Sequence, residues 1–455
     1  MVFSSFDFLI KFLPAFLIVY YASVKFLSKA RNFVVFLFSM IFYAYGAFKD
    51  NHPLYLLLIF ASVCVNYFLG RMLNGQKQRK LWLCIGLVFD FSCLFFFKYT
   101  DFVFGTSLDL ALPIGISFYT FQIASYLIDV YRNPDLSEKN FVNLGAYIMM
   151  FPQLIAGPIV RFNEVRKALT QRKESLSLFV DGIKIFVLGL GSKVLIANQV
   201  GVVWQDIQMM GYDAITCKLA WLGIIAYSLQ IYFDFYGYSL MAIGLGKMIG
   251  FEFPTNFNAP YTAVSMTDFW RKWHMTLGSW FKEYVYIPLG GNRKGIARTY
   301  LNLFIVWMLT GIWHGADWNF VLWGLLLFIL IAVEKAGLGD FMEKHRLIGH
   351  IYMIILIPLQ WAVFAINGFD NIKMFFYSLL GHDGPWAWDA DFMQYSPVIL
   401  GIMLLGIILS SKLPQKLYRK FKNSAIMYIV LVLVLAGSVY CLYMGMNDPF
   451  LYFRF

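Results

Sequence analysis

The chain has 455 residues, of which 60% are hydrophobic and 14% charged, whereas a soluble domain has roughly 25% charged residues. Too few polar side chains remain to cover a large water-soluble body, so the composition excludes that class. The formal net charge of +11 does not indicate nucleic-acid binding, because the basic residues form short clusters between apolar segments, at 71–80, 161–173, 271–298 and 412–422.

Apolar segments long enough to cross about 30 Å of hydrocarbon recur along the chain. Backbone groups in lipid must be hydrogen-bonded within the chain, so we expect helices there. The first segment, 8–21, lacks a basic leader and contains Lys11, and is expected to be a retained span. The prediction is an all-α polytopic membrane protein with roughly eleven spans in a single domain, 1–455. Further clear candidates are 54–69, 81–97, 300–312, 321–333, 351–366 and 426–443.

Charged loops predict the orientation of these spans. Short loops rich in Lys and Arg mark the cytoplasmic side, which places the basic clusters inside. The segments 201–216 and 381–395 contain aspartates but no Lys or Arg and are expected outside, as loops. This predicts a multi-pass inner-membrane protein with 268–298 on the cytoplasmic side and His314 near the outward end of its span or in the membrane interior.

Two apolar segments are interrupted. Segment 112–131 begins LPIGISFYTFQ, and segment 141–159 contains Pro152, Gly157 and Pro158, which break a helix. Non-helical backbone at membrane depth must be buried in protein or line a cavity. The second segment therefore predicts a re-entrant element, with a helix–loop–helix below the membrane as the alternative.

Two charged residues in apolar segments and one aromatic segment lead to further predictions. Asp234 and Lys247 lie in apolar surroundings, where a bare charge costs about 2.5–3.5 kcal/mol or more. They are either functional or, as we favour, structural charges that pair with each other or with Lys193. Segment 268–287 is aromatic but too charged to span. Its periodicity predicts one helix in the interface plane, with His274 at the edge of the apolar face.

Six histidines occur in the chain, and His274 and His314 each lie in an aromatic-rich segment. Imidazole titrates near neutral pH, so these positions favour acid–base chemistry. Taken alone, a Trp–His pair near the end of a span is more often an interfacial anchor or a buried structural histidine. Five isolated cysteines predict neither a disulfide framework nor a metal site.

Five stretches together resemble the membrane-bound O-acyltransferase (MBOAT) family, in particular its bacterial branch that acetylates alginate and related polysaccharides. They occupy much of residues 110–325, the motif-bearing core, and are LPIGISFYTFQIASYLIDVYR, FPQLIAGPIVRF, LQIYFDFYGYSLMAIGLGKMIGFEFPTNFNAPY, DFWRKWHMTLGSWFKEYVYIPLGGNR and WHGADWNFVLWG. The resemblance implies a ring of tilted, re-entrant and interfacial helices around a central tunnel. The family's Trp-His-Gly histidine maps onto His314, and its upstream position maps onto His274.

The resemblance implies acetyl transfer from acetyl-CoA, a donor substrate, without a tightly bound cofactor. A neutral imidazole can remove the acceptor's hydroxyl proton, which makes His314 the candidate general base. His274 would orient the donor, hydrogen-bond the thioester carbonyl or act as an acid. We expect the two histidines to lie along a path and not to form one dyad. Basic positions suited to the donor phosphates are Arg161, Arg271, Lys272, Arg293 and Lys294.

The predicted function is an O-acyltransferase that moves acetyl groups from a cytoplasmic donor across the inner membrane to an exported or envelope polysaccharide, with an extracytoplasmic serine-type O-acetyltransferase as partner. Peptidoglycan O-acetylation is an alternative, as is teichoic-acid D-alanylation, which uses an acylated carrier protein. From other classes, a transporter or a non-catalytic export scaffold remains. A transporter would predict inverted repeats, and none is visible in the sequence.

Overall fold

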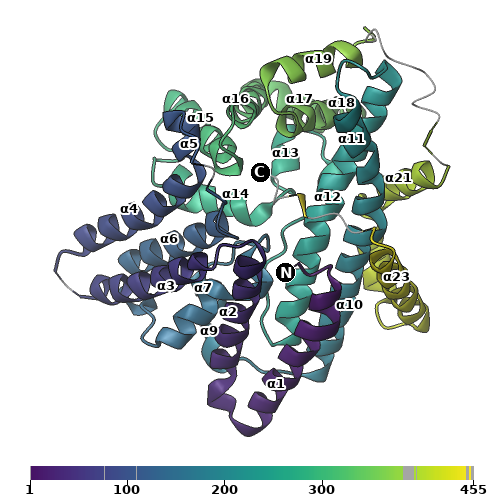
Figure 1. The fold of residues 1–455 in the computed structure, drawn as a ribbon. Coiled ribbons are helices and arrows are strands. Elements are labelled where there is room, and N and C mark those ends of the chain that lie inside the picture. The colour runs from purple at the N-terminus through teal and green to yellow at the C-terminus, as the bar shows by residue number, and fades with distance from the viewer. Residues whose placement is uncertain are drawn as a thin grey trace. The chain divides into compact units, whose positions relative to one another are not determined.

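The computed structural model describes residues 2–75, 77–108, 110–382, 394–395, 397–446 and 450–451. Over these residues the secondary structure is helical and contains no strand, which confirms the all-α class (Figure 1). The longer helices of the first half are α1 (Leu13–Phe26), α2 (Arg31–Lys49), α3 (Leu54–Leu73), α4 (Arg79–Lys98), α6 (Ile116–Arg132), α10 (Leu176–Gly191), α11 (Asn198–Met210) and α12 (Cys217–Met248). Those of the second half are α15 (Ile296–His314), α16 (Trp318–Val333), α18 (Arg346–Ala365), α19 (Phe369–Leu379), α21 (Pro397–Leu409), α22 (Leu413–Phe421) and α23 (Ala425–Tyr443).

Contacts divide the chain into two compact units. Unit 1 comprises residues 1–186 and 238–255, and unit 2 comprises 187–237 and 256–455. Helices α10 and α12 contribute residues to both units. The single domain expected from the sequence stays a prediction, and the units are described separately.

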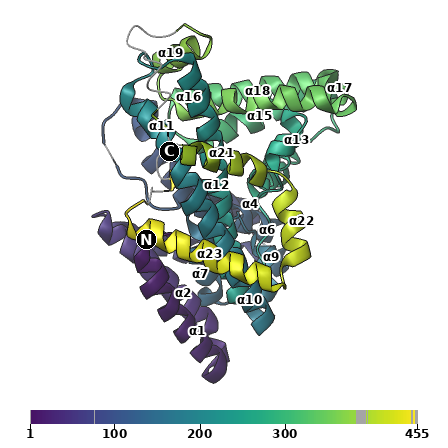
Figure 2. The ribbon, with the colours of Figure 1, turned by 90° about the vertical axis from the view of Figure 1, so that its right-hand side faces the viewer.

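Eight helices in the described ranges are long and apolar enough to cross a membrane, and a ninth span results if α21 and α22, bent by 74°, are counted as one (Figure 2). The chain is therefore a multi-pass membrane protein. The sequence suggested roughly eleven spans. Part of the difference arises because α6 and α10, with 17 and 16 residues, are shorter than a typical span of about 20 residues. The segment 201–216 is not a loop throughout, since α11 extends to Met210.

In unit 1 the predicted interruption near Pro152 is confirmed. Helix α7 (Phe141–Met149) ends before the four-residue α8 (Phe151–Leu154), and the chain is non-helical from there to α9 (Phe162–Gln171). The segment is buried, and the Tyr147 hydroxyl donates to the Val160 carbonyl at 2.9 Å. The irregular backbone is thus covered by protein, as membrane depth would require. Its re-entrant nature stays a prediction.

In unit 2 a buried ion pair joins the π-helix η4 (Ser192–Ala197), which directly follows α10, to α12. Lys193 Nζ lies 2.5 Å from Asp234 Oδ1, and both side chains are almost fully buried. This confirms one of the two partners expected for Asp234. The second carboxylate oxygen of Asp234 accepts the Leu451 backbone N–H at 2.7 Å. The pair therefore also holds the segment near the end of the chain against α12.

Helices α15 and α16 form a tight hairpin in unit 2. Glycines permit the close approach, since a Cβ on Gly311 would lie 2.4 Å from the Phe320 carbonyl oxygen and one on Gly324 would lie 2.6 Å from that of Trp307. Three residues connect the helices, and the last, Asp317, caps α16 by accepting the Trp318 N–H at 2.5 Å. His314, the last residue of α15, is consequently held at a rigid corner.

Candidate active site

The segment around His274 is not the continuous helix predicted from its periodicity. Four residues separate helix α13 (Met266–Trp270) from helix α14 (Met275–Phe281). Between them His274 adopts a left-handed conformation, with φ 44° and ψ 51°. This conformation costs about 1–2 kcal/mol for a residue with a side chain, so contacts from elsewhere must stabilise it.

Asn256 supplies those contacts. Its buried Oδ1 lies 3.0 Å from His274 Nδ1 and accepts from the Thr276 backbone N–H at 3.3 Å and the Thr276 hydroxyl at 3.0 Å. Its backbone carbonyl accepts from the Met275 N–H at 2.9 Å. A residue 18 positions upstream therefore fixes both the break in the helix and the plane of the imidazole.

The same network assigns the tautomer of His274. A backbone N–H can only donate, so the Asn256 atom facing Thr276 is the carbonyl oxygen of the amide. That oxygen accepts from His274, so the proton resides on Nδ1 and Nε2 carries a lone pair. Burial lowers the pKa of His274 from 6.5 to about 3, because desolvation disfavours the charged ring. His274 is therefore a neutral imidazole at pH 7.

His274 is also more deeply buried than the interfacial position predicted for it. Only 2% of its surface is exposed, and its ring packs edge-on against Phe235 of α12 with centroids 4.7 Å apart. The ring centroid of Trp313, on α15, lies 6.1 Å from that of His274. The helical-wheel pattern correctly marked an apolar environment, but that environment is protein.

His314 lies in an aromatic cage. Its ring contacts those of Trp313, Trp323 and Phe364 at centroid distances of 5.0, 5.2 and 5.2 Å. Trp323 is itself fixed, because its indole N–H donates to Gln360 Oε1 at 2.6 Å. Trp313 contacts both histidines, so the structure places the two predicted residues in one neighbourhood of unit 2.

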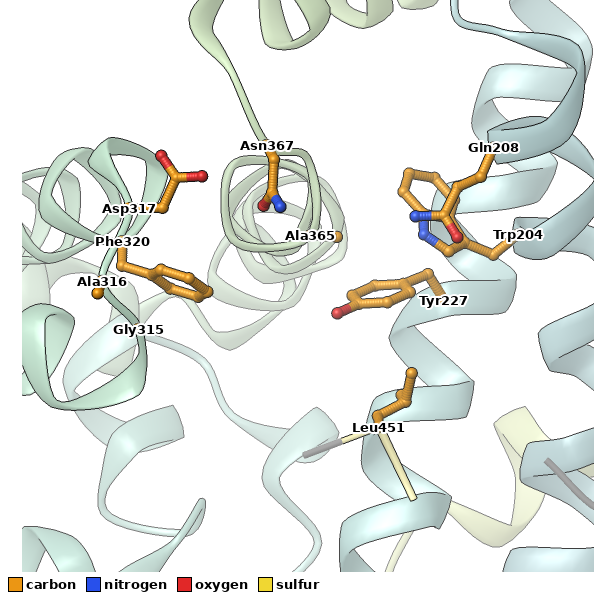
Figure 3. A pocket seen from close by; sticks show the side chains of 10 residues that line it. All are labelled: Trp204, Gln208, Tyr227, Gly315, Ala316, Asp317, Phe320, Ala365, Asn367 and Leu451. Atoms are coloured by element: carbon orange, nitrogen blue, oxygen red, sulfur yellow. The ribbon is translucent and has the colours of Figure 1, made fainter. Parts of the chain in front are cut away.

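A cavity of about 310 Å³ is lined in part by residues that directly follow His314 and Phe364 in the sequence (Figure 3). Gly315, the next residue, is part of its wall, and so is Ala365, the residue after Phe364. Figure 3 shows Trp204 and Gln208 of α11 and Tyr227 of α12 on one side of the cavity, and the connection between α15 and α16 on the other side. The lining residues are Trp204, Gln208, Tyr227, Gly315, Ala316, Asp317, Phe320, Ala365, Asn367 and Leu451.

The basic residues predicted to bind the donor are divided between the units. Arg271, Arg293 and Lys294 are exposed in unit 2. Lys272, also in unit 2, pairs with Asp268 at 2.6 Å. Arg161 belongs to unit 1, where it contacts Glu164 at 2.8 Å in a capping interaction. Their role in donor binding stays a prediction.

Within the described ranges, no three His, Cys, Asp or Glu side chains gather in a way that could hold a metal ion. Sequence reasoning did not single out Asn256 or the cavity residues Trp204, Tyr227, Asp317 and Asn367. Asn256 and Asp317 stand inside stretches that carry the family resemblance, which was the available signal. The others come from segments without a motif.

A buried histidine whose next residue lines a cavity, in a multi-span helical protein, is compatible with a membrane acyltransferase, and sequence comparisons identify that class. The model of the MBOAT, membrane-bound O-acyltransferase family, matches residues 134–344. A probable alginate O-acetylase of Azotobacter vinelandii is 37% identical over 90% of this chain and 84% of its own length. The chain belongs to the membrane-bound O-acyltransferase family and is a membrane-bound O-acyltransferase.

Other relatives show which polymers the similar proteins act on. A probable alginate O-acetylase of Pseudomonas putida is 38% identical over 85% of this chain and 81% of its own length. A peptidoglycan O-acetyltransferase of Helicobacter pylori is 34% identical over 76% of this chain and 73% of its own length. These relatives support acyl modification of a polysaccharide.

Proposed function

We propose that this protein transfers acetyl groups from cytoplasmic acetyl-CoA to a hydroxyl group on the outer side of the inner membrane, for O-acetylation of an exported or envelope polysaccharide. The observation that carries the proposal is the position of His314, which is buried among aromatic rings and directly precedes the wall of a cavity. In this proposal the acceptor hydroxyl reaches the imidazole from the side of that cavity.

In the proposed reaction His314 is the general base. It removes the hydroxyl proton as the oxygen attacks the thioester carbonyl carbon, and the C–S bond then breaks. The leaving thiolate takes up the proton from the imidazolium, which restores neutral His314. The products are an acetyl ester and free CoA, so atoms and charge balance without a further reactant.

His274 acts as a positioning group for the donor. Its Nδ1–H is directed to Asn256, so its Nε2 lone pair can accept a hydrogen bond and has no proton to give to a carbonyl. Of the roles expected from the sequence, donor orientation fits this tautomer and polarisation of the thioester carbonyl does not. An amide N–H of the acetyl-CoA arm is a suitable donor to Nε2.

The basic residues attract the donor, and a second protein completes the pathway. Arg271, Lys272, Arg293 and Lys294 of unit 2, with Arg161 of unit 1, would concentrate polyanionic acetyl-CoA on the cytoplasmic side. An extracytoplasmic serine-type O-acetyltransferase is the proposed partner that handles the final polymer.

Peptidoglycan O-acetylation is the second candidate, favoured by the 34% identity to the Helicobacter pylori enzyme. D-alanylation has less support, since a teichoic acid D-alanyltransferase of Lacticaseibacillus rhamnosus is 25% identical over 64% of this chain. Membership of an enzyme family does not favour the transporter and scaffold alternatives.

The proposal is tested with labelled acetyl-CoA in membranes that contain the wild-type protein or His314→Ala. Wild-type membranes should release CoA and produce base-labile acetyl esters, and the variant should lose both at an equal protein level. Unchanged esterification by His314→Ala at normal protein abundance would contradict the role of His314 as the general base.

A further inference from the structure

Helix α22 is a short basic helix of unit 2 that the proposed reaction does not use. Its nine residues include Lys416, Arg419 and Lys420, and a lysine flanks it at each end. The sequence from 397 to 446, which covers α21, α22 and α23, contains no Asp or Glu. Lys416, Arg419 and Lys420 are exposed, so this part of the surface carries a concentrated positive charge.

The basic side chains occupy one side of α22, and apolar side chains occupy the other. At about 100° per residue, Lys416, Arg419 and Lys420 fall within one half of the helix circumference. Leu413 and Leu417 fall in the other half, and each of them is 45% exposed. A basic amphipathic helix with an exposed apolar side is typical of a helix that lies in the membrane interface.

The bend between α21 and α22 gives α22 an orientation that suits this location. The two helices meet at 74°, and Figure 2 shows α22 between the ends of α21 and α23. Leu404 of α21 and Leu433 of α23 are exposed, as expected for helices that face lipid. When α21 runs across the membrane, α22 therefore runs close to the membrane plane. As the second half of a bent span, α22 would instead carry three cations into hydrocarbon, where each is costly.

We infer that α22 binds an anionic phospholipid, with the phosphate held by its basic side and the acyl chains against Leu413 and Leu417. The helix presents cations beside an exposed apolar surface, which complements both parts of such a lipid. A soluble anion such as acetyl-CoA would use the cations and leave the leucines exposed. The inference goes beyond the proposed function, because this contact requires no acyl transfer.

The test uses the full-length protein in detergent micelles with equal amounts of phosphatidylglycerol and phosphatidylcholine. Native mass spectrometry counts the lipid molecules that remain bound. Wild-type protein should retain phosphatidylglycerol over phosphatidylcholine by at least about tenfold, and this preference should decrease at high salt. Equal retention of the two lipids would overturn the inference.

A triple variant isolates the contribution of α22 to this preference. Lys416→Gln, Arg419→Gln and Lys420→Gln together remove three charges, and glutamine has a helix propensity close to that of lysine and arginine. The preference for phosphatidylglycerol should fall at least about fivefold. A variant with Lys416→Arg and Lys420→Arg keeps the charge and should retain the preference. An unchanged preference in the glutamine variant would overturn the inference.

A matched control removes three exposed charges from the segment between α16 and α18. Lys335→Gln, Lys344→Gln and Arg346→Gln change basic residues that alternate with the exposed acidic residues Asp340 and Glu343. Because those carboxylates offset the positive charge, this variant should keep most of the preference for phosphatidylglycerol. An equal loss in the two triple variants would show that total charge and not α22 causes the preference, and would overturn the inference.

Two further measurements separate lipid binding from the donor and from catalysis. His314→Ala should retain phosphatidylglycerol like the wild type, so a loss of acetyl transfer in that variant leaves the lipid site in place, and a loss of lipid in the α22 variant leaves the role of His314 in place. Acetyl-CoA added at a concentration equal to that of the lipid should not displace phosphatidylglycerol. Displacement in the wild type would assign α22 to the soluble donor and overturn the inference.

Discussion

The two histidines of unit 2 are held in opposite ways. His274 lies at a break between short helices and is fixed by the hydrogen bond that it donates to Asn256, whereas His314 ends a long helix and is packed against the rings of Trp313, Trp323 and Phe364. A polar network determines the tautomer of His274, while His314 is enclosed by aromatic rings and its next residue, Gly315, lines a cavity. In the proposed function, this difference suits a fixed acceptor of hydrogen bonds at one position and a reacting base at the other.

Removal of the Asn256 side-chain amide should have the largest effect on this comparison. Asn256→Leu deprives the His274 Nδ1–H and the Thr276 N–H of a buried acceptor, and each unsatisfied group costs about 1–3 kcal/mol. We predict a loss of about 100-fold in acetyl transfer, a misplacement effect, together with lower thermal stability. Initial rates and thermal unfolding in detergent measure both.

Two further variants are compared with Asn256→Leu, one as a control and one that keeps the acceptor. Asn258→Leu, at an exposed position two residues away, should change the rate by less than about twofold. Asn256→Asp keeps the acceptor but adds an anion beside the ring, which favours the imidazolium. It should therefore shift the pH profile of the rate upward. An unchanged rate in Asn256→Leu would contradict the role given to the network.

The next largest effect is expected in the pH dependence of the free energy of unfolding. The unfolded chain protonates His274 near pH 6.5, whereas burial lowers its pKa in the folded protein to about 3. Between these values the unfolded state binds more protons, so stability falls as pH decreases from 6.5 and this loss ends near 3. The slope from this group is at most about 1.4 kcal/mol per pH unit, or about 2 kcal/mol between pH 6.5 and 5.

Chemical denaturation at several pH values measures that slope. His274→Gln should flatten it, and His345→Gln, which alters an exposed histidine, should leave it as in the wild type. A wild-type slope retained in His274→Gln would show that other groups cause the acid sensitivity.

A conservative change in the aromatic cage of His314 should lower the rate of acetyl transfer by a smaller factor. Trp323→Phe keeps an aromatic ring but removes the N–H that donates to Gln360. We predict a loss of about tenfold in rate, since one buried hydrogen bond and some packing are lost. Trp318→Phe on the same helix, where the side chain is 59% exposed, is the control and should be nearly silent in initial-rate assays. Equal effects of the two changes would argue against the cage.

The smallest effect is expected at the exposed basic residues. Arg293→Gln and Lys294→Gln should each raise KM for acetyl-CoA about threefold with little change in kcat, because they act on encounter and not on the reacting atoms. The effect should shrink at high salt. Lys373→Gln, an exposed lysine on α19, serves as control. A fall in kcat without a rise in KM would place these residues in another role.

The sequence predicted the features that depend on local patterns. Long apolar runs predicted the spans, and Pro152 with Pro158 predicted the broken segment. It failed at His274, because the aromatic periodicity of 268–287 is helical while the break is imposed by Asn256 from another segment. It also underestimated burial there, since a hydrophobic face does not reveal whether lipid or protein covers it.

The candidate site was likewise predicted where local patterns determine it and missed where distant segments meet. Histidine rarity and the motif stretches predicted His274 and His314, which the structure brings to one neighbourhood around Trp313. The cavity wall could not be predicted, because Trp204, Tyr227 and Asn367 come from α11, α12 and the connection after α18 without a shared motif. Their proximity is a product of tertiary packing.

The central claim is that His314 is the base for acetyl transfer. Its most direct test is the initial rate of acetyl ester formation from labelled acetyl-CoA by purified His314→Gln in nanodiscs, beside the wild type and His345→Gln. The account predicts a loss of at least about 100-fold for His314→Gln, with thermal unfolding close to that of the wild type and His345→Gln fully active. A properly folded His314→Gln protein that retains a rate within about twofold of the wild type would contradict it.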